Sequence, residues 1–185
     1  VLLKEFIGLA APINGCWIDG TFGAGGYSKA LLQNGAQEVL AIDKDPTTRV
    51  FLKNIQNEYG DMIKFYNQSF ADMEKNKDIA GRDDIGGVVL DLGVSSMHLD
   101  NPLRGFSFRE NGPLDMRMGD QSRPTASEII NLCSETTLAD LIFYYGQERK
   151  ARKIANRIVK ERKKKKINTT LESVSYTHLR VHETV

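Results

Sequence analysis

The sequence predicts an α/β protein built on a parallel, doubly wound sheet. Three observations carry this prediction: short apolar runs alternate with amphipathic stretches, glycines and aspartates follow several of the runs, and the alternation stops after residue 93. Strands that alternate with helices form parallel sheets covered by helices. The 185 residues, 41% of them hydrophobic, are sufficient for one domain, alone or with a modest appendage.

Four strands and their connecting helices follow from the apolar pattern. The predicted strands are "GCWIDG" (15–20), "EVLAID" (38–43), "DMIKFY" (61–66) and "IGGVVLDLG" (85–93). The predicted helices between them lie at residues 27–35, 46–59 and 70–77. The continuous apolar core of the fourth run is typical of a strand covered on both faces.

A long irregular stretch and a second group of helices follow. Residues 95–125 are rich in Gly, Pro, Arg and Phe without a sustained period, which indicates a functional loop or the start of an insertion. Helical patterns return at residues 126–133, 137–146 and 148–166. The second half of a doubly wound sheet is therefore unaccounted for.

The net charge of +1 conceals two regions of opposite sign. From Arg149 to Lys166, eleven Lys or Arg stand against one acid, Glu161, so this segment carries +10 and the other residues −9. Two interpretations stay open: a solvated helix face, or a surface that contacts RNA or phosphate.

Several classes of protein are not expected. No apolar run is long enough to span a bilayer and the N-terminus has no signal pattern, so we expect a soluble intracellular protein. Cys16 and Cys133 lack the spacing of a disulfide framework or zinc site, and we expect buried thiols. His98, His178 and His182 form no known ligand motif, so no protein-bound catalytic metal is expected.

The stretch "WIDGTFGAGGYSKALL" (17–32) places four glycines between the first strand and the first helix. In such a turn the backbone N–H groups face a ligand, and the missing Cβ atoms permit close contact. Asp43 ends the second strand, eighteen residues after Gly25, where a carboxylate can accept hydrogen bonds from both ribose hydroxyls. The loop therefore indicates a ribose-bearing cofactor, either NAD or S-adenosylmethionine.

Two further carboxylates favour the sulfonium cofactor. Asp19 lies inside the first turn, where it would repel a pyrophosphate but would suit the ammonium group of a methionine moiety. Asp91 ends the fourth strand at the same edge of the sheet. Three carboxylates at strand ends favour a cationic ligand, although each aspartate could instead only cap a turn.

Four segments carry a resemblance to a known family: "DGTFGAGGYSKA", "AIDKDP", "VVLDLGVSSMHLDNPLRGFSFRENGPLDMRM" and "YGQERKARKIANRIV". From about Val1 to Leu171 the chain resembles the ribosomal small-subunit (16S) rRNA cytosine-N4 methyltransferase family. The resemblance implies S-adenosylmethionine as cofactor and N4 of a decoding-centre cytidine as the methylated atom. It also implies a class I, Rossmann-like methyltransferase sheet with a helical domain inserted after the fourth strand.

The resemblance also implies a set of cofactor contacts. They fall on Gly25, Gly26, Tyr27, Asp43, Phe70, Asp91 and His98. Tyr27 stands where many members have His, which a backbone contact tolerates, and His98 stands where most have Gln. The catalytic group stays open between the Asp91 carboxylate, a backbone carbonyl of the "DLGVSS" turn and Ser95.

The stretch "RGFSFRENGPLDMRM" interleaves arginines with aromatic residues. We expect Arg104, Phe106, Phe108, Arg109 and Arg117 to bind the substrate. Bases stack on aromatic rings and phosphates pair with guanidinium groups, so this pattern suits a splayed, single-stranded nucleotide. The alternative is an ordered loop held by internal pairs between these arginines and Asp115.

The expected domain organisation has three parts. Residues 1–100 begin the methyltransferase domain, and residues 101–172 form the loop and an inserted helical substrate domain. Residues 173–185 depart from the sequence pattern of the family, and we expect them to be an artefact tail. Family members continue with further strands, so we expect an incomplete sheet with a bare edge.

The expected partner is small-subunit rRNA or the small ribosomal subunit, with no membrane; a homodimer stays open. The expected location is the bacterial cytoplasm, with the mitochondrial matrix as the alternative. Two rival functions are a nucleotide- or RNA-binding fragment without catalysis and an NAD-dependent oxidoreductase, which Asp19 disfavours.

Overall fold

The computed structural model describes residues 2–119 and 121–177, which divide into two compact units. The first, here called the sheet unit, comprises Val1–Gly93 and Met118–Asp120. The second, the helical unit, comprises Val94–Arg117 and Gln121–Val185. In the described part of the chain, no helix has the length and apolar character needed to cross a membrane.

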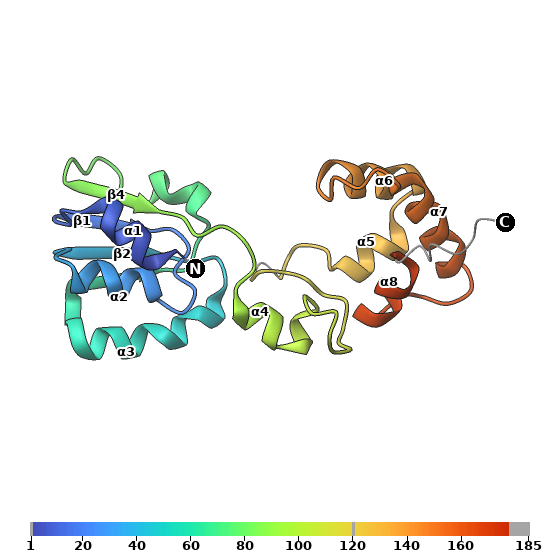
Figure 1. The fold of residues 1–185 in the computed structure, drawn as a ribbon, viewed down its shortest axis with the longest axis horizontal. Helices are drawn as coiled ribbons and strands as arrows, with labels where there is room; N and C mark the ends of the chain where they lie inside the picture. The colour runs from blue at the N-terminus through green and yellow to red at the C-terminus, as the bar shows by residue number, and fades with distance from the viewer. Residues whose placement is uncertain (1, 120, 178–185) are drawn as a thin grey trace. The chain divides into compact units, whose positions relative to one another are not determined.

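The sheet unit contains four strands and three α-helices (Figure 1). They are α1 (Leu3–Ala10), β1 (Cys16–Asp19), α2 (Gly26–Gln33), β2 (Glu38–Ile42), α3 (Arg49–Tyr59), β3 (Ile63–Tyr66) and β4 (Ile85–Val89). Short 3₁₀-helices lie at Pro46–Thr48, Gly60–Met62 and Phe70–Lys75. The strand order is β3-β2-β1-β4 and every pair is parallel, which confirms the predicted α/β class and its parallel sheet.

Apolar side chains cover both faces of the inner strands, because alternate residues of a strand point to opposite faces. On one face, Trp17 and Val39 pack with Leu31 of α2 and Leu52 of α3. On the other face, the opposite residues of β1 and β2 pack with Ile79, from the segment after the 3₁₀-helix Phe70–Lys75. The inner strands are thus covered on both sides, as in a doubly wound fold.

The prediction that β4 is covered on both faces is wrong. β4 pairs only with β1 among the described strands, and its residues alternate in burial. Val89 is 6% exposed, whereas Val88 and Leu90 are 43% and 41% exposed. The apolar run therefore marks an edge strand with one face uncovered among the described residues.

Some element boundaries differ from the predictions. The helix predicted at residues 70–77 is a 3₁₀-helix, Phe70–Lys75, and the third strand begins at Ile63, after another 3₁₀-turn. The helix α1 was not predicted; its Phe6 and Ile7 pack against the core of the sheet unit.

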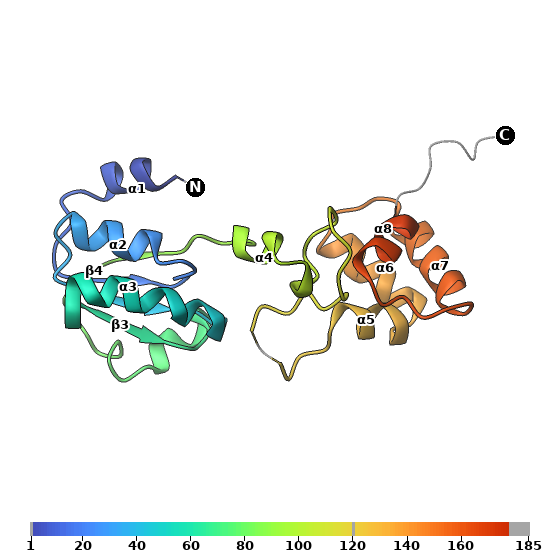
Figure 2. The same ribbon diagram turned by 90° about the horizontal axis from the view of Figure 1, so that it is seen from below.

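The helical unit contains five α-helices in its described residues (Figure 2). They are α4 (Ser96–Asp100), α5 (Ala126–Leu132), α6 (Glu135–Tyr144), α7 (Ala151–Arg162) and α8 (Thr170–Thr177). A 3₁₀-helix lies at Pro102–Arg104. Together with α4 it interrupts the stretch 95–125, predicted to be irregular, and that prediction is confirmed only for the described residues of the stretch after Arg104, which form no helix or strand. Side-chain caps at Thr125 and Ser134 fix where α5 and α6 begin.

The apolar stripe of α7 forms the centre of the helical unit. Ile154, Ala155 and Ile158 are buried at helical spacing and pack with Leu138 of α6 and with Ile167. The predicted stripe is therefore confirmed, and the basic residues of α7 are left around it.

The remaining expectations about cysteine and the tail have mixed outcomes. Cys16 is buried as expected, and burial raises the pKa of its thiol to about 11. Cys133 is only half-buried, because it follows the end of α5. His178, His182 and residues 178–185 of the expected tail lie outside the described residues.

Candidate functional site

The loops at the carboxyl ends of β1 and β4 are joined by hydrogen bonds. Parallel strands present their carboxyl ends at one edge of the sheet, which is the usual ligand edge of such folds. The backbone N–H of Gly20 donates to the carbonyl of Val89 over 2.9 Å. The backbone N–H of Asp91 donates to Oγ1 of Thr21 over 2.7 Å. The glycine loop and the turn after β4 are therefore held together.

Asp19 is fully buried and holds the glycine loop to the first turn of α2. Its carboxylate accepts hydrogen bonds from the backbone N–H groups of Thr21 and Ser28, at 3.2 and 3.1 Å, and from Oγ of Ser28 at 2.7 Å. Burial raises the pKa of Asp19 to about 6, although these hydrogen bonds lower it. With 0% exposure it offers no surface to a ligand, so the expected contact with an ammonium group is wrong.

Asp43 joins the same loop to the end of β2. Its Oδ2 accepts a hydrogen bond from the N–H of Gly23 over 2.8 Å, and its Oδ1 accepts one from the N–H of Asp45 over 2.9 Å. A carboxylate offers about four lone-pair sites, so two such bonds leave further acceptor capacity. Asp43 is half-buried, and it can therefore still accept hydrogen bonds from outside.

The glycines of the loop are required for different reasons. A Cβ on Gly20 would lie 2.4 Å from a methyl of Leu90, and one on Gly25 would lie 2.4 Å from a methyl of Ile55. Gly25 also has φ +80°, a conformation that costs other residues free energy. Gly26 has open space at its Cβ position and is exposed at the start of α2. Only there, among these three glycines, does the missing side chain leave room for a ligand.

Phe70 and Tyr27 lie differently around this edge. Cβ of Phe70 is 3.2 Å from the position of a Cβ on Gly20, so the half-buried Phe70 stands beside the end of β1. The ring of Tyr27 instead packs edge-on against Phe6 of α1, with 5.4 Å between centroids. Burial, and next the charge of Asp91, raise the pKa of Tyr27. The ring of Tyr27 thus packs against the core of the sheet unit. A ligand contact at this position would therefore be made by the backbone of Tyr27.

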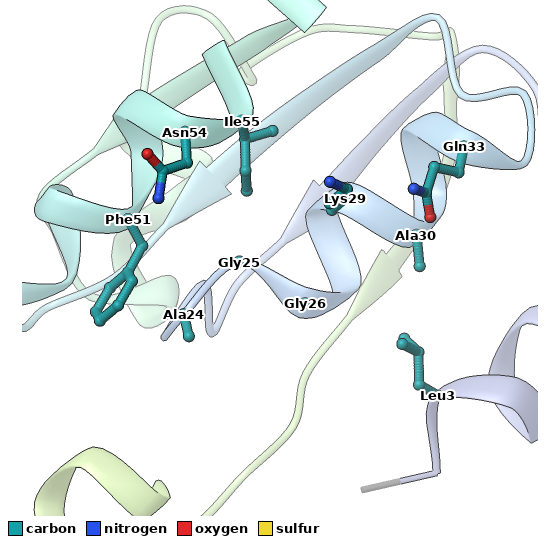
Figure 3. A pocket seen from close by; sticks show the side chains of 10 residues that line it. All are labelled: Leu3, Ala24, Gly25, Gly26, Lys29, Ala30, Gln33, Phe51, Asn54 and Ile55. Carbon is teal, nitrogen blue, oxygen red and sulfur yellow. The ribbon is translucent and has the colours of Figure 1, made fainter. Parts of the chain in front are cut away.

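A groove of about 320 Å³ opens beside the glycine loop, between α2 and α3 (Figure 3). Its lining residues are Leu3, Ala24, Gly25, Gly26, Lys29, Ala30, Gln33, Phe51, Asn54 and Ile55. Nζ of Lys29 donates to Glu58 over 2.7 Å, so this cation is already paired. The groove shares Gly25 and Gly26 with the predicted cofactor contacts, but it contains neither Asp43 nor Phe70 nor Asp91, so it covers only one side of the strand-end site.

His98 belongs to the helical unit, where it stabilises the start of α4. Its Nδ1 accepts a hydrogen bond from the backbone N–H of Ser95 over 3.2 Å and lies 3.0 Å from Oγ of Ser95. The ring lies 5.1 Å from that of Phe106 and is 8% exposed. An accepting Nδ1 requires the tautomer with the proton on Nε2. His98 and Phe106 therefore support each other inside the loop.

Two arginines of the predicted substrate set are held within the loop. Arg117 makes a two-point contact with Asp115, with Nε–Oδ1 and Nη2–Oδ2 distances of 2.8 and 2.7 Å. This guanidinium group holds the pKa of Asp115 below its ordinary value. Nη2 of Arg104 donates to the carbonyl of Arg117 over 3.1 Å. Arg104 and Arg117 therefore fit the alternative to substrate binding, an ordered loop held by internal contacts.

Phe108 and Arg109 are more exposed than the other residues predicted to bind the substrate. Phe108 is 70% exposed and Arg109 is also exposed. The loop that carries them is anchored to the helices, because the N–H of Leu114 donates to the carbonyl of Asn168 over 2.9 Å. The helical unit thus presents one aromatic ring and one guanidinium group on a supported loop.

Sequence reasoning missed several polar groups at the strand ends. Ser28 and Thr21 were not singled out, since a serine or threonine in a glycine-rich turn carries no specific signal. Nε2 of Gln68, two residues before Phe70, is a buried donor without a hydrogen-bond partner among the described residues. Among those residues, no cluster of His, Cys, Asp or Glu has the arrangement of a metal site.

Comparison with known proteins shows the family. The model of the MraW methylase family matches residues 1–183. The ribosomal RNA small subunit methyltransferase H of Cereibacter sphaeroides is 44% identical over 171 residues, which cover 92% of this chain and 50% of the relative. The protein of the same name from a Wolbachia of Drosophila simulans is 47% identical over 173 residues, 93% of this chain and 59% of the relative.

A solved rRNA methylase from Streptococcus thermophilus aligns with a TM-score of 0.37 and 16% identity, covering 59% of this chain and 65% of that one. The chain spans about half the length of the curated relatives it matches. With 44–47% identity across nearly all of its residues and a matching family model, this chain belongs to the MraW methylase family.

Proposed function

We propose that this chain supplies the methyl-donor site of a small-subunit rRNA methyltransferase. The observation that carries the proposal is the strand-end site. There Asp43 holds the glycine loop at Gly23 and keeps free acceptor capacity, and Gly26 of the same loop has open space at its Cβ position. Membership of the MraW methylase family and the names of its relatives support the reaction class. The more specific proposal is transfer from S-adenosylmethionine to N4 of a cytidine in the decoding centre.

The residues present fit S-adenosylmethionine. Asp43 can accept from the ribose hydroxyls, and the ring of Phe70 can cover the adenine from its place beside Gly20. The backbone of Gly25, Gly26 and Tyr27 starts α2, where N–H groups favour a carboxylate. The bound cofactor would supply an electrophilic methyl group.

Asp91 is the acid at this edge that we propose for the cationic part of the cofactor. It is exposed, and its backbone is fixed to Thr21, whereas Asp19 is buried. A carboxylate in this position favours a positively charged ligand over a pyrophosphate. Asp91 therefore favours S-adenosylmethionine over NAD, whereas Asp43 suits the ribose of either cofactor. His98 stays a proposed contact from the helical unit.

The helical unit would bind the RNA around the target base. Phe108 and Arg109 are the exposed members of the substrate set and suit a base and a phosphate. Arg104, Phe106 and Arg117 would act by holding their loop. The target cytosine must leave its stack, which costs a few kcal/mol, and exposed stacking groups offset part of that cost.

The reacting amine needs an acceptor for its proton. The lone pair of cytosine N4 is delocalised into the ring, so alignment and a hydrogen-bond acceptor near N4 are required for attack on the methyl group. The proposed acceptor is the Asp91 carboxylate, a carbonyl of residues 91–96 or Ser95, and these three stay as alternatives. Ser95 already contacts His98.

The domain assignment extends the same proposal. Residues 1–100 would be the first part of the methyltransferase domain, 101–172 the loop and inserted substrate domain, and 173–185 a separate tail, although the family model matches as far as residue 183. The partner would be small-subunit rRNA or the assembled subunit, in the cytoplasm of a bacterium, since the relatives named above are bacterial. Nothing here supports the mitochondrial alternative. A homodimer stays a separate prediction.

The test is a calorimetric titration with S-adenosylhomocysteine, followed by transfer of a labelled methyl group to small ribosomal subunits. We expect micromolar binding, weakened at least tenfold by Asp43→Ala and by Asp91→Ala. The matched control is Asp83→Ala, which removes an exposed acid at the opposite end of β4. A preference for NADH, or equal effects of all three variants, would contradict the proposed site.

A binding module without catalysis is the second candidate function. It is favoured by one observation: β4 has an uncovered face and edge among the described residues. S-adenosylhomocysteine binding without label on the RNA would support this candidate for the chain. Label found on protein alone would contradict the RNA assignment.

A further inference from the structure

The basic segment of α7 has its charges on the face opposite the core. Ala155 and Ile158 point into the helical unit, whereas Arg152, Lys153 and Lys160 are exposed. This separation follows from the helical period, which places residues 152, 153 and 160 away from the apolar stripe. Arg152, Lys153 and Lys160 therefore lie on one exposed, cationic face of α7.

These exposed cations are not neutralised by carboxylates. The ion pairs of this segment join Lys164 to Glu161 and Lys165 to Glu172, at 3.0 and 2.7 Å. Among the described residues, no carboxylate forms an ion pair with Arg149, Arg152, Lys153 or Lys160. A solvated helix face usually interleaves both signs. Here one carboxylate reaches the cationic face: that of Glu135 in α6, which accepts a hydrogen bond from Nδ2 of Asn156 over 3.1 Å and forms no ion pair with these cations.

Exposed aromatic rings lie on the short connection that leads into α7 and at the end of α6. Tyr144 and Tyr145 end α6 and are 73% and 85% exposed, four to five residues before Arg149. The ring of Phe143 lies 5.3 Å from that of Tyr144, edge-on. The short connection to Ala151 keeps these rings at the end of the α6–α7 pair where α7 begins.

We propose that these residues form a second RNA-binding surface, here called the α6–α7 surface. It consists of Tyr144, Tyr145, Arg149, Arg152, Lys153 and Lys160. Cations of this kind bind backbone phosphates, and exposed aromatic rings stack unpaired bases, so the surface suits a single-stranded RNA segment. The inference rests on the proposed function, which makes RNA the substrate, and adds a contact outside the loop of Phe108.

The alternative occupant, an anionic membrane surface, fits the structure less well. A helix that lies in a membrane interface needs an exposed apolar face. The apolar face of α7 is buried, with Ile154 6% and Ala155 0% exposed. The two most exposed rings before α7, Tyr144 and Tyr145, carry hydroxyls that suit polar contacts.

The first test measures RNA binding by fluorescence anisotropy with a labelled single-stranded fragment of small-subunit rRNA. The triple variant R152Q/K153Q/K160Q is compared with K4Q/K53Q/K77Q, which removes three exposed lysines of the sheet unit. We expect the first to lower affinity at least tenfold at about 100 mM salt, and to flatten the log–log salt slope by about 2. The control variant should change affinity less than twofold.

The second test addresses stacking. Y144A/Y145A should lower affinity for the single strand about tenfold and leave affinity for the corresponding duplex unchanged, because paired bases offer no free face. The matched control is Leu132→Ala, which removes a 78% exposed apolar side chain of the same unit. All substituted residues are exposed, and circular dichroism checks that each variant is folded.

Two results would overturn the inference. One is equal RNA affinity and equal salt slope for the two triple variants. The other is loss of binding to phosphatidylglycerol vesicles in R152Q/K153Q/K160Q while RNA binding is retained. Titration of the same proteins with S-adenosylhomocysteine separates this inference from the proposed function: failure of the wild type to bind it contradicts the function, and leaves the RNA result to be judged alone.

Discussion

The two units use charge in opposite ways. In the sheet unit, Asp19 and Asp43 are turned toward the backbone and hold the glycine loop by hydrogen bonds. In the helical unit, Arg152 and Lys153 are turned to solvent, while apolar packing of Ile158 and its neighbours holds the helices together. Charged side chains thus hold a backbone loop in one unit and form an open surface in the other, which is why removing a charge should have different consequences in each.

The largest expected effect comes from Gly25→Ala in the sheet unit. The new Cβ would overlap Ile55 and Phe22 at φ +80°, so we expect about 4 kcal/mol of destabilisation and loss of S-adenosylhomocysteine binding. Gly26→Ala is the matched control, because open space surrounds that position. It should keep the melting temperature while lowering ligand affinity. If both variants melt alike, the packing explanation of Gly25 is wrong.

The helical unit should be most sensitive at its apolar centre. Ile158→Ala removes a buried side chain, 3% exposed, and should destabilise that unit by about 3 kcal/mol. Urea denaturation followed by hydrogen exchange would locate the loss in α5 to α8. Val159→Ala, at a half-buried position on the same helix, should cost less. Equal costs would show that burial does not decide stability here.

The pH dependence of stability should report on Asp19, the buried carboxylate of the sheet unit. Because folding raises the pKa of Asp19 to about 6, its contribution favours the folded state at low pH and is lost as the pH rises through 6. Relative to Asp19→Asn, the wild type should lose up to about 3 kcal/mol between pH 4 and 7. Denaturant melts of both proteins across this range measure the difference. Parallel pH profiles would contradict a buried, titrating Asp19.

The smallest expected effects concern the loop of the helical unit. Arg117→Gln breaks a two-point ion pair with Asp115 and should cost about 1 kcal/mol, since both side chains are partly exposed. Arg109→Gln should leave stability unchanged and weaken RNA binding. Thermal melts and anisotropy together separate these roles. Equal stability of both variants would mean that the ion pair does not hold the loop.

Some features could be predicted because they depend on local pattern. The alternation of strands and helices, the stripe of α7 and the position of Asp43 at a strand end follow from residue spacing, and the structure has all three. The aspartates could not be ranked in this way. The same residue type at the ends of β1 and β4 is buried in one case, Asp19, and exposed in the other, Asp91.

The sequence by itself determined the order of the four strands and of helices α2, α3, α5, α6 and α7, the family, and the sign of charge on each segment. These follow from patterns and motifs of residues near one another along the chain. Only the tertiary structure decided that Asp19 closes the loop, that Gly25 makes room for Ile55 while Gly26 faces open space, and that Arg117 serves its own loop. The physical reason is that burial and hydrogen bonding depend on which distant segments meet, and residue type does not fix that.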